Sequence, residues 1–137
     1  FKNDVTKTIP FSFLGGGFKA IVGLVWLILS EKNVINRVVL LDEPETHMHP
    51  GYIHELVKII IKFSKELNIQ FFIVTHNIDL IDRLFSEDLS PEEKTYLKIE
   101  LTILRMENIK QYITSEYLNY DDAKYNKDKL YLDLRGL

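Results

Sequence analysis

The chain has 137 residues, of which 46 % are hydrophobic and 27 % are charged, and its formal net charge is −3. This length and balance predict one globular unit that can bury a core, and the net charge excludes an overall basic field for binding nucleic acid. There is no cysteine, which excludes a disulfide framework, a cysteine-based zinc site and thiol catalysis.

The longest apolar run, IVGLVWLIL, covers residues 21–29. It is about half as long as a membrane-spanning helix, so we expect no membrane segment. The sequence has no signal-peptide pattern, and it begins with Phe1 instead of Met. We therefore expect a cytoplasmic protein and a chain that is a piece of a longer one.

The first part of the chain predicts a helix followed by a strand–helix–strand unit. A helix is predicted over residues 18–32, and its apolar residues lie nearly all round it, which predicts burial on several sides. Residues 38–42 (VVLLD) and 69–75 (IQFFIVT) are typical of fully buried parallel strands. Residues 51–67 between them have helical periodicity, and these lengths predict a right-handed βαβ unit.

The rest of the chain changes in character. A short helix is predicted over residues 78–85, and an acidic loop or helix start over 86–93. Residues 96–106 predict a long strand that pairs with 109–116 through a turn at 107–108, and 119–129 predict a helix. The tyrosines of this tail would suit base stacking, but its aspartates favour packing or protein contact. We expect it to pack on the core and complete the sheet edge, with a docking element as the alternative.

Polar side chains follow both predicted parallel strands, Asp42 and Glu43 after the first and His76 after the second. Ligands of such sheets bind at the carboxyl ends of the strands. Asp42 offers a hard oxygen ligand for Mg²⁺, and Glu43 can orient an attacking water. His76 can contact a γ-phosphate. The alternatives are a solvated turn at Asp42 and Glu43, and a helix-capping role for His76.

Two further clusters carry a chemical interpretation. Gly15, Gly16 and Gly17 can offer backbone N–H groups to a phosphate at a helix start, or simply form a flexible turn. A zinc or copper site is the other hypothesis, because His-x-His can chelate such ions. Its candidate ligands lie within ten positions: Glu45, His47, His49 and His54.

The order of these motifs resembles the second half of an ABC-type ATPase domain. Residues 14–18 resemble the signature motif, 39–44 the Walker B motif and 46–49 the D-loop, and His76 resembles the switch histidine. The forms DEPETHMHP and FFIVTHN are most similar to AAA-type and archaeal ATPases related to the overcoming-lysogenization-defect family. The resemblance covers about residues 11–85.

The resemblance implies an α/β fold, namely the C-terminal half of a P-loop NTPase with parallel strands and flanking helices, plus a small β-containing tail. The implied division is residues 1–86 for the ATPase part and 87–137 for a C-terminal extension with a strand pair and a short helix. By the same resemblance Asp42 would hold Mg²⁺, Glu43 would be the general base, and His76 would contact the γ-phosphate of ATP.

The resemblance also implies a homodimer that sandwiches ATP, with Gly15, Gly16 and Gly17 facing the nucleotide of the partner subunit and residues 46–49 linking the two sites. The chain departs from the family pattern at Gly15, where a Ser is usual, and at His49, where an Asp is usual.

A larger departure is the absence of the phosphate-binding pattern G-x-x-x-x-G-K-[ST] from all 137 residues. We therefore expect the C-terminal part of a longer ATPase, or a naturally shortened relative, that binds ATP poorly alone. Nucleic acid or an effector protein would bind through parts outside this chain. The alternative function is a non-catalytic interaction or dimerisation module.

Overall fold

The structure is a computed structural model that describes residues 10–30, 37–109 and 112–135. The first elements are η1 (Phe11–Phe13), α1 (Gly16–Ser30), β1 (Val38–Asp42), α2 (Pro50–Leu67), β2 (Gln70–Val74) and α3 (Ile78–Leu84). They are followed by α4 (Pro91–Glu100), β3 (Thr102–Ile109), β4 (Tyr112–Asn119) and α5 (Tyr120–Lys129). The mixture of parallel strands and flanking helices confirms the predicted α/β fold.

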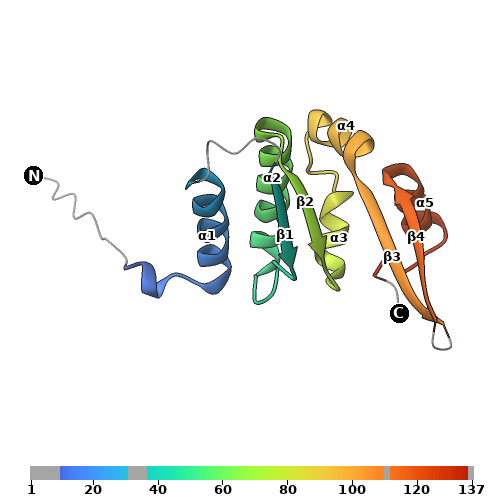
Figure 1. The fold of residues 1–137 in the computed structure, drawn as a ribbon, viewed down its shortest axis with the longest axis horizontal. Coiled ribbons are helices and arrows are strands. Elements are labelled where there is room, and N and C mark those ends of the chain that lie inside the picture. Colours follow the sequence, from blue (N-terminus) through green and yellow to red (C-terminus); the bar gives the residue numbers. More distant parts are fainter. Residues whose placement is uncertain (1–9, 31–36, 110–111, 136–137) are drawn as a thin grey trace, which may run out of the picture.

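Strands β1 and β2 pair in parallel, from Val38 opposite Gln70 to Asp42 opposite Val74. Their arrows point the same way in Figure 1, and α2 and α3 lie behind them. The carboxyl ends of the two strands therefore lie side by side, as the βαβ prediction requires.

Helix α2 forms where the periodicity predicts it. His49 caps its start, Pro50 occupies the first turn, and Asn68 ends it in the left-handed conformation with φ 52°. One face of the helix is apolar and buried, and this face packs into the core. Its buried residues are Ile53, Leu56, Val57 and Ile61.

One hydrophobic cluster joins α2 and α3 to the tail. Phe85 and Tyr120 meet in it with their ring centroids 5.1 Å apart. The cluster contains Ile53, Leu56, Val57, Ile61, Leu80, Ile81, Phe85, Leu89, Leu97, Leu118, Tyr120, Ala123 and Leu134. The tail therefore packs on the core as predicted. It does not complete the edge of the parallel sheet, because β3 and β4 form a separate two-stranded antiparallel sheet.

The strand prediction for residues 96–106 is wrong at its start, because residues up to Glu100 continue helix α4. Ser90 and Glu93 form a capping box: the Glu93 N–H donates to Ser90 Oγ at 3.2 Å, and the Ser90 N–H donates to Glu93 Oε2 at 2.7 Å. A helix that starts at such a capping box continues through residues 96–100, although their alternating pattern weakly favours a strand. Strand β3 then runs through residues 107 and 108, so the turn predicted there is also wrong.

Helix α1 and the parallel sheet are less buried than predicted. Helix α1 buries only Gly17 and Ile28, and Trp26 is 76 % exposed. In the sheet, alternate residues face α2, while the opposite face exposes Val38, Leu40, Phe72 and Val74. The apolar composition of α1 and of the strands predicted that other elements cover them. Among the described residues, however, helices cover only one face of the sheet. The predicted end of the first helix at residue 32 lies outside the described residues.

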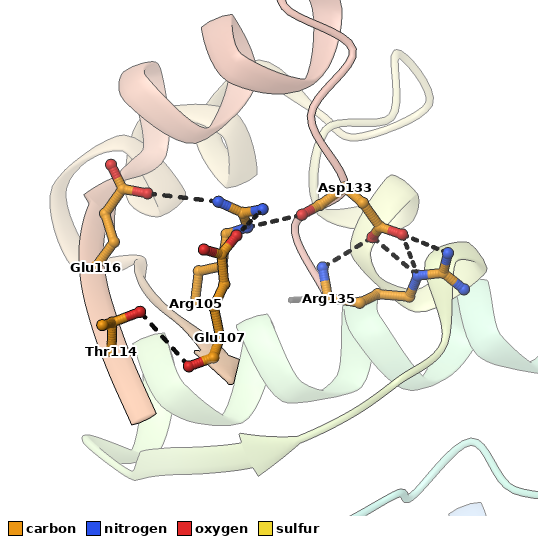
Figure 2. Close-up of polar contacts among 6 residues, drawn as sticks. All are labelled: Arg105, Glu107, Thr114, Glu116, Asp133 and Arg135. Carbon is orange, nitrogen blue, oxygen red and sulfur yellow. Dashed lines mark hydrogen bonds and ion pairs between the residues drawn. The ribbon is translucent and has the colours of Figure 1, made fainter. Parts of the chain in front are cut away.

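Arg105 ties the β3–β4 hairpin to the C-terminal segment, as Figure 2 shows. Its Nε donates to the backbone oxygen of Asp133 at 2.8 Å, its Nη2 pairs with Glu107, and its Nη1 lies 3.8 Å from Glu116 Oε2. Asp133 in turn accepts hydrogen bonds from the guanidinium and the backbone N–H of Arg135, which lower the pKa of Asp133 from 3.8 to about 2. No helix that the structure describes is long and apolar enough to cross a lipid bilayer.

Candidate functional site

The site begins where β1 ends. Asp42 is the last residue of β1, lies opposite Val74 and has an exposed side chain. The next N–H, that of Glu43, still donates to Val74 O at 2.8 Å. Strand pairing therefore holds the backbone of Asp42 and Glu43 against β2.

Glu43 and His76 come together at this edge. The Glu43 Oε1 atom lies 3.7 Å from His76 Nε2, and both side chains are exposed to solvent. Thr46 Oγ1 also donates to Glu43 Oε2 at 3.3 Å. Glu43 has φ 43°, a conformation that costs energy in a residue other than glycine and is found at functional sites. The structure thus brings together the side chains of Glu43 and His76, which were predicted at the strand ends, and Asp42 directly precedes Glu43.

His76 does not cap the helix that follows it, so that alternative is wrong. The cap of α3 is Asn77, whose Oδ1 accepts from the N–H groups of Asp79 at 2.8 Å and Leu80 at 3.4 Å. The imidazole of His76 is left pointing toward Glu43, with which it forms an ion pair whenever it is protonated.

The loop after Glu43 is held by its own backbone. The Thr46 N–H donates to Glu43 O at 3.0 Å, and the Met48 N–H donates to Glu45 O at 2.9 Å. His47 has φ 64°, a second unfavourable conformation. His49 ends the loop by capping α2, because its Nδ1 accepts from the Gly51 N–H at 3.2 Å.

The zinc or copper hypothesis finds no support. Among residues 10–30, 37–109 and 112–135 no three His, Asp or Glu side chains converge as metal ligands would. Instead, the Glu45 carboxylate accepts a hydrogen bond from Thr75, and His49 Nδ1 accepts one from the Gly51 N–H as the cap of α2.

The three glycines divide into two kinds. A Cβ added to Gly15 or Gly16 would meet no atom within 4 Å, whereas one on Gly17 would lie 3.2 Å from Met48 Cγ and 3.3 Å from Tyr52 Cδ2. Gly15 and Gly16 therefore leave open space at the start of α1. Gly17 is a packing residue that lets α1 approach α2 and the loop after β1.

The hydrogen bond between Glu45 and Thr75 was not predicted from the sequence. Glu45 was predicted only as a candidate metal ligand, but the structure buries this side chain at 4 % exposure with Thr75 Oγ1 donating to its Oε1. The available signal was position: Thr75 directly follows β2 and Glu45 lies three residues beyond β1, so parallel pairing brings both to one edge.

The carboxyl edge of the paired parallel strands thus carries an acidic pair and a histidine, as expected for part of an ABC/AAA-type ATPase domain. Comparison with protein families agrees. Residues 1–82 match the family described as "AAA domain, putative AbiEii toxin, Type IV TA system". The match covers more than half of the chain, and the chain belongs to this family.

The similar proteins include one that this chain matches over its whole length and others that it matches over only part of their length. The uncharacterized protein MJECL11 of Methanocaldococcus jannaschii is 30 % identical over 125 residues, which is 90 % of this chain and 100 % of that protein. The energy-coupling factor transporter ATP-binding protein EcfA2 of Clostridium perfringens is 32 % identical over 75 residues, or 55 % of this chain. This chain spans only 25 % of that EcfA2 protein.

A solved structure of an SMC ATPase has the same fold, with a TM-score of 0.59. The likeness covers 93 % of this chain and 69 % of that one, at 16 % sequence identity. The described work on that protein concerns ATP-driven dimerization and DNA-stimulated activation of SMC ATPases.

Proposed function

We propose that these residues form the water-activating half of an ATP-hydrolysing, ABC-like ATPase. The observation that carries the proposal is the approach of Glu43 Oε1 to His76 Nε2 at 3.7 Å, at the carboxyl ends of two paired parallel strands. Both side chains are exposed and lie in the loops that follow the two strands, so a substrate phosphate can reach both at once.

In this proposal Glu43 is the general base. It orients a water molecule and accepts its proton while the water oxygen bonds to the γ-phosphorus and the bond to the β–γ bridging oxygen breaks. His76 donates a hydrogen bond to the γ-phosphate, where negative charge must be stabilised. Thr46 Oγ1, 3.3 Å from Glu43 Oε2, keeps the carboxylate turned toward this edge.

Mg²⁺ is the cofactor of the proposed reaction, and it would neutralise phosphate charge when bound. Asp42 suits it, because its exposed carboxylate provides the hard oxygen ligand that Mg²⁺ prefers. Its place at the end of β1, one residue before Glu43, fits a metal-holding role beside the base.

We further propose that hydrolysis requires a phosphate-binding loop and a second subunit. The pattern G-x-x-x-x-G-K-[ST] does not occur in these 137 residues, so these residues alone are proposed to be inactive. Gly15 and Gly16 would face ATP held by the partner subunit of a homodimer, an idea supported by the open space around them and by the dimerization described for the SMC ATPases of similar fold. Nucleic acid or an effector protein would be contacted by other parts of the molecule.

The test is Mg-ATP turnover by the full natural polypeptide that carries these residues. We expect Glu43→Gln to lower kcat by about a hundredfold or more, because a positioned base contributes that much, with ATP binding retained. Glu66→Gln is the matched control, since Glu66 is exposed near the far end of α2. Equal turnover in wild type and Glu43→Gln would remove Glu43 as the base.

The second candidate is a non-catalytic interaction module, which the missing phosphate-binding pattern favours. In that case the natural polypeptide neither hydrolyses ATP nor changes its assembly state with it. The molar mass of the Glu43→Gln variant, measured by light scattering with and without Mg-ATP, distinguishes the two candidate functions. If the protein is an ATPase, the variant accumulates as an ATP-bound dimer. If it is an interaction module, Mg-ATP leaves the molar mass of the variant unchanged.

A further inference from the structure

Glu45 is the one charged side chain that the structure buries within its described residues, at 4 % exposure. Removing a carboxylate from water is costly unless hydrogen bonds compensate. Glu45 also lies in an irregular loop, two residues after Glu43, where Glu43 and His47 have positive φ angles of 43° and 64°. Such conformations persist only when their surroundings enforce them.

The Glu45 carboxylate has one side-chain hydrogen-bond partner, Thr75, on its Oε1 atom, while its Oε2 atom is buried without a partner among the described residues. Thr75 Oγ1 accepts from the Asn77 N–H at 3.0 Å and donates to Glu45 Oε1. A hydroxyl has a single hydrogen, and here Glu45 receives it. The chain of bonds therefore runs from the backbone beyond His76, through the Thr75 hydroxyl, to the carboxylate in the loop beyond Glu43.

This bond joins the two loops that carry the proposed catalytic pair. Thr75 directly precedes His76, and Glu45 lies two residues beyond Glu43. The last backbone hydrogen bond between the β1 and β2 segments joins the Glu43 N–H to Val74 O. The side-chain hydrogen bond from Thr75 to Glu45 therefore links the two segments beyond the point where their backbone pairing ends. We infer that Glu45 and Thr75 are positioning residues that set the spacing between Glu43 and His76, an inference that rests on the proposed ATPase function.

Variants at Thr75 test the hydroxyl. Thr75→Val keeps the branched shape and removes the donor, whereas Thr75→Ser keeps the donor. We expect Thr75→Val to lower kcat roughly tenfold to a hundredfold with little change in KM, because small displacements of reacting groups have effects of that size. Thr75→Ser should remain close to wild type.

Variants at Glu45 separate positioning from base catalysis. Gln keeps an oxygen that accepts from Thr75, so Glu45→Gln should retain turnover although Glu43→Gln loses it. Thr75→Val alone leaves a buried carboxylate without its donor and can unfold the protein. The double variant Glu45→Met with Thr75→Val replaces both partners by apolar groups and so removes the buried carboxylate, which lowers the cost in stability. The remaining cost is the Asn77 N–H, which loses its acceptor, and the folded double variant should still lose turnover.

The exchange rate of the Asn77 amide hydrogen in the 137-residue chain reports on its hydrogen bond to Thr75 and does not depend on ATP hydrolysis. Faster exchange in Thr75→Val than in Thr75→Ser is expected, and equal exchange overturns the network. If wild type hydrolyses ATP, Glu43→Gln does not, and the folded double variant matches wild type, the positioning role alone is overturned. If wild type lacks turnover, the proposed ATPase function fails and the positioning role fails with it, whatever the exchange shows.

Discussion

At the residue scale, neighbouring glycines at the start of α1 should respond differently to the same substitution. In a helix interior Ala is favoured over Gly by about 0.8–1 kcal/mol. Both glycines lie in the first turn of α1, so the change in propensity is similar at the two positions and cancels in a comparison. A Cβ at Gly16 meets no atom within 4 Å, whereas one at Gly17 lies 3.2 Å from Met48 Cγ and 3.4 Å from Met48 Cα. Overpacking typically costs about 1–3 kcal/mol. We expect Gly17→Ala to be about 1 kcal/mol less stable than Gly16→Ala in urea unfolding, and equal stability would contradict the tight contact.

Asp133 should make stability depend on pH in the acid range. Its hydrogen bonds from Arg135 lower its folded-state pKa from 3.8 to about 2. Because the folded value lies below the unfolded one, the ion pair stabilises the protein above about pH 4, and this contribution is lost as the pH falls toward about 2. Both side chains are partly exposed, so the effect is small.

The corresponding variant is Asp133→Asn, measured by thermal unfolding from neutral to acid pH. We expect a slightly lower Tm than wild type near neutral pH and a difference that shrinks to nothing as the pH approaches about 2. A difference that persists there would mean that Asp133 acts through packing and not through its charge.

The bond between Glu45 and Thr75 marks the limit of sequence reasoning at this scale. The positions of Asp42, Glu43 and His76 at the strand ends were predictable from the strand pattern, while their chemical roles stay predictions. Glu45 has the same chemistry as Glu43, but its role depends on burial, which differs between the two although only Pro44 separates them. Spacing alone does not reveal which carboxylate faces solvent and which faces the core.

At the element scale, helix α4 depends on its capping box. The Ser90 Oγ atom satisfies the Glu93 N–H, one of the amides that a helix start leaves unpaired. We expect Ser90→Ala to lower the free energy of unfolding by about 1 kcal/mol, the usual cost of losing such a cap. Ser90→Asp keeps an acceptor and serves as the control. A loss of the same size in both variants, measured in urea, would point to a cause other than capping.

The same capping box explains why α4 was mispredicted. Residues 86–93 were interpreted as a loop or helix start, and the alternating residues from Tyr96 onward then favoured a strand, although Ser90 and Glu93 have the spacing of a capping box. The sequence after Pro91 contains no glycine or further proline before Glu100, so the helix that begins there continues through the residues predicted as strand. The βαβ unit was predictable because strand composition and helical period agree there.

At the scale of the whole molecule, the open face of the parallel sheet is the largest departure from the prediction. Leu40 is 76 % exposed and Phe72 52 %, although parallel sheets are usually covered on both faces. The sequence indicated apolar strands, but composition alone does not say which segment covers each face. α2 and α3 cover one face, and none of the described helices covers the other.

An exposed apolar face of this kind promotes association. We expect the 137-residue chain to self-associate with rising concentration in sedimentation velocity, and the double variant Leu40→Thr with Phe72→Thr to do so less. Threonine retains strand propensity, and exposed substitutions change stability little, so the Tm should stay close to wild type. The matched control is Val39→Thr with Ile73→Thr on the half-buried face, which should lower the Tm without reducing association. If the Leu40 and Phe72 variant associates as strongly as wild type, another surface drives assembly, and the exposed apolar side of α1 around Trp26 is the next to change.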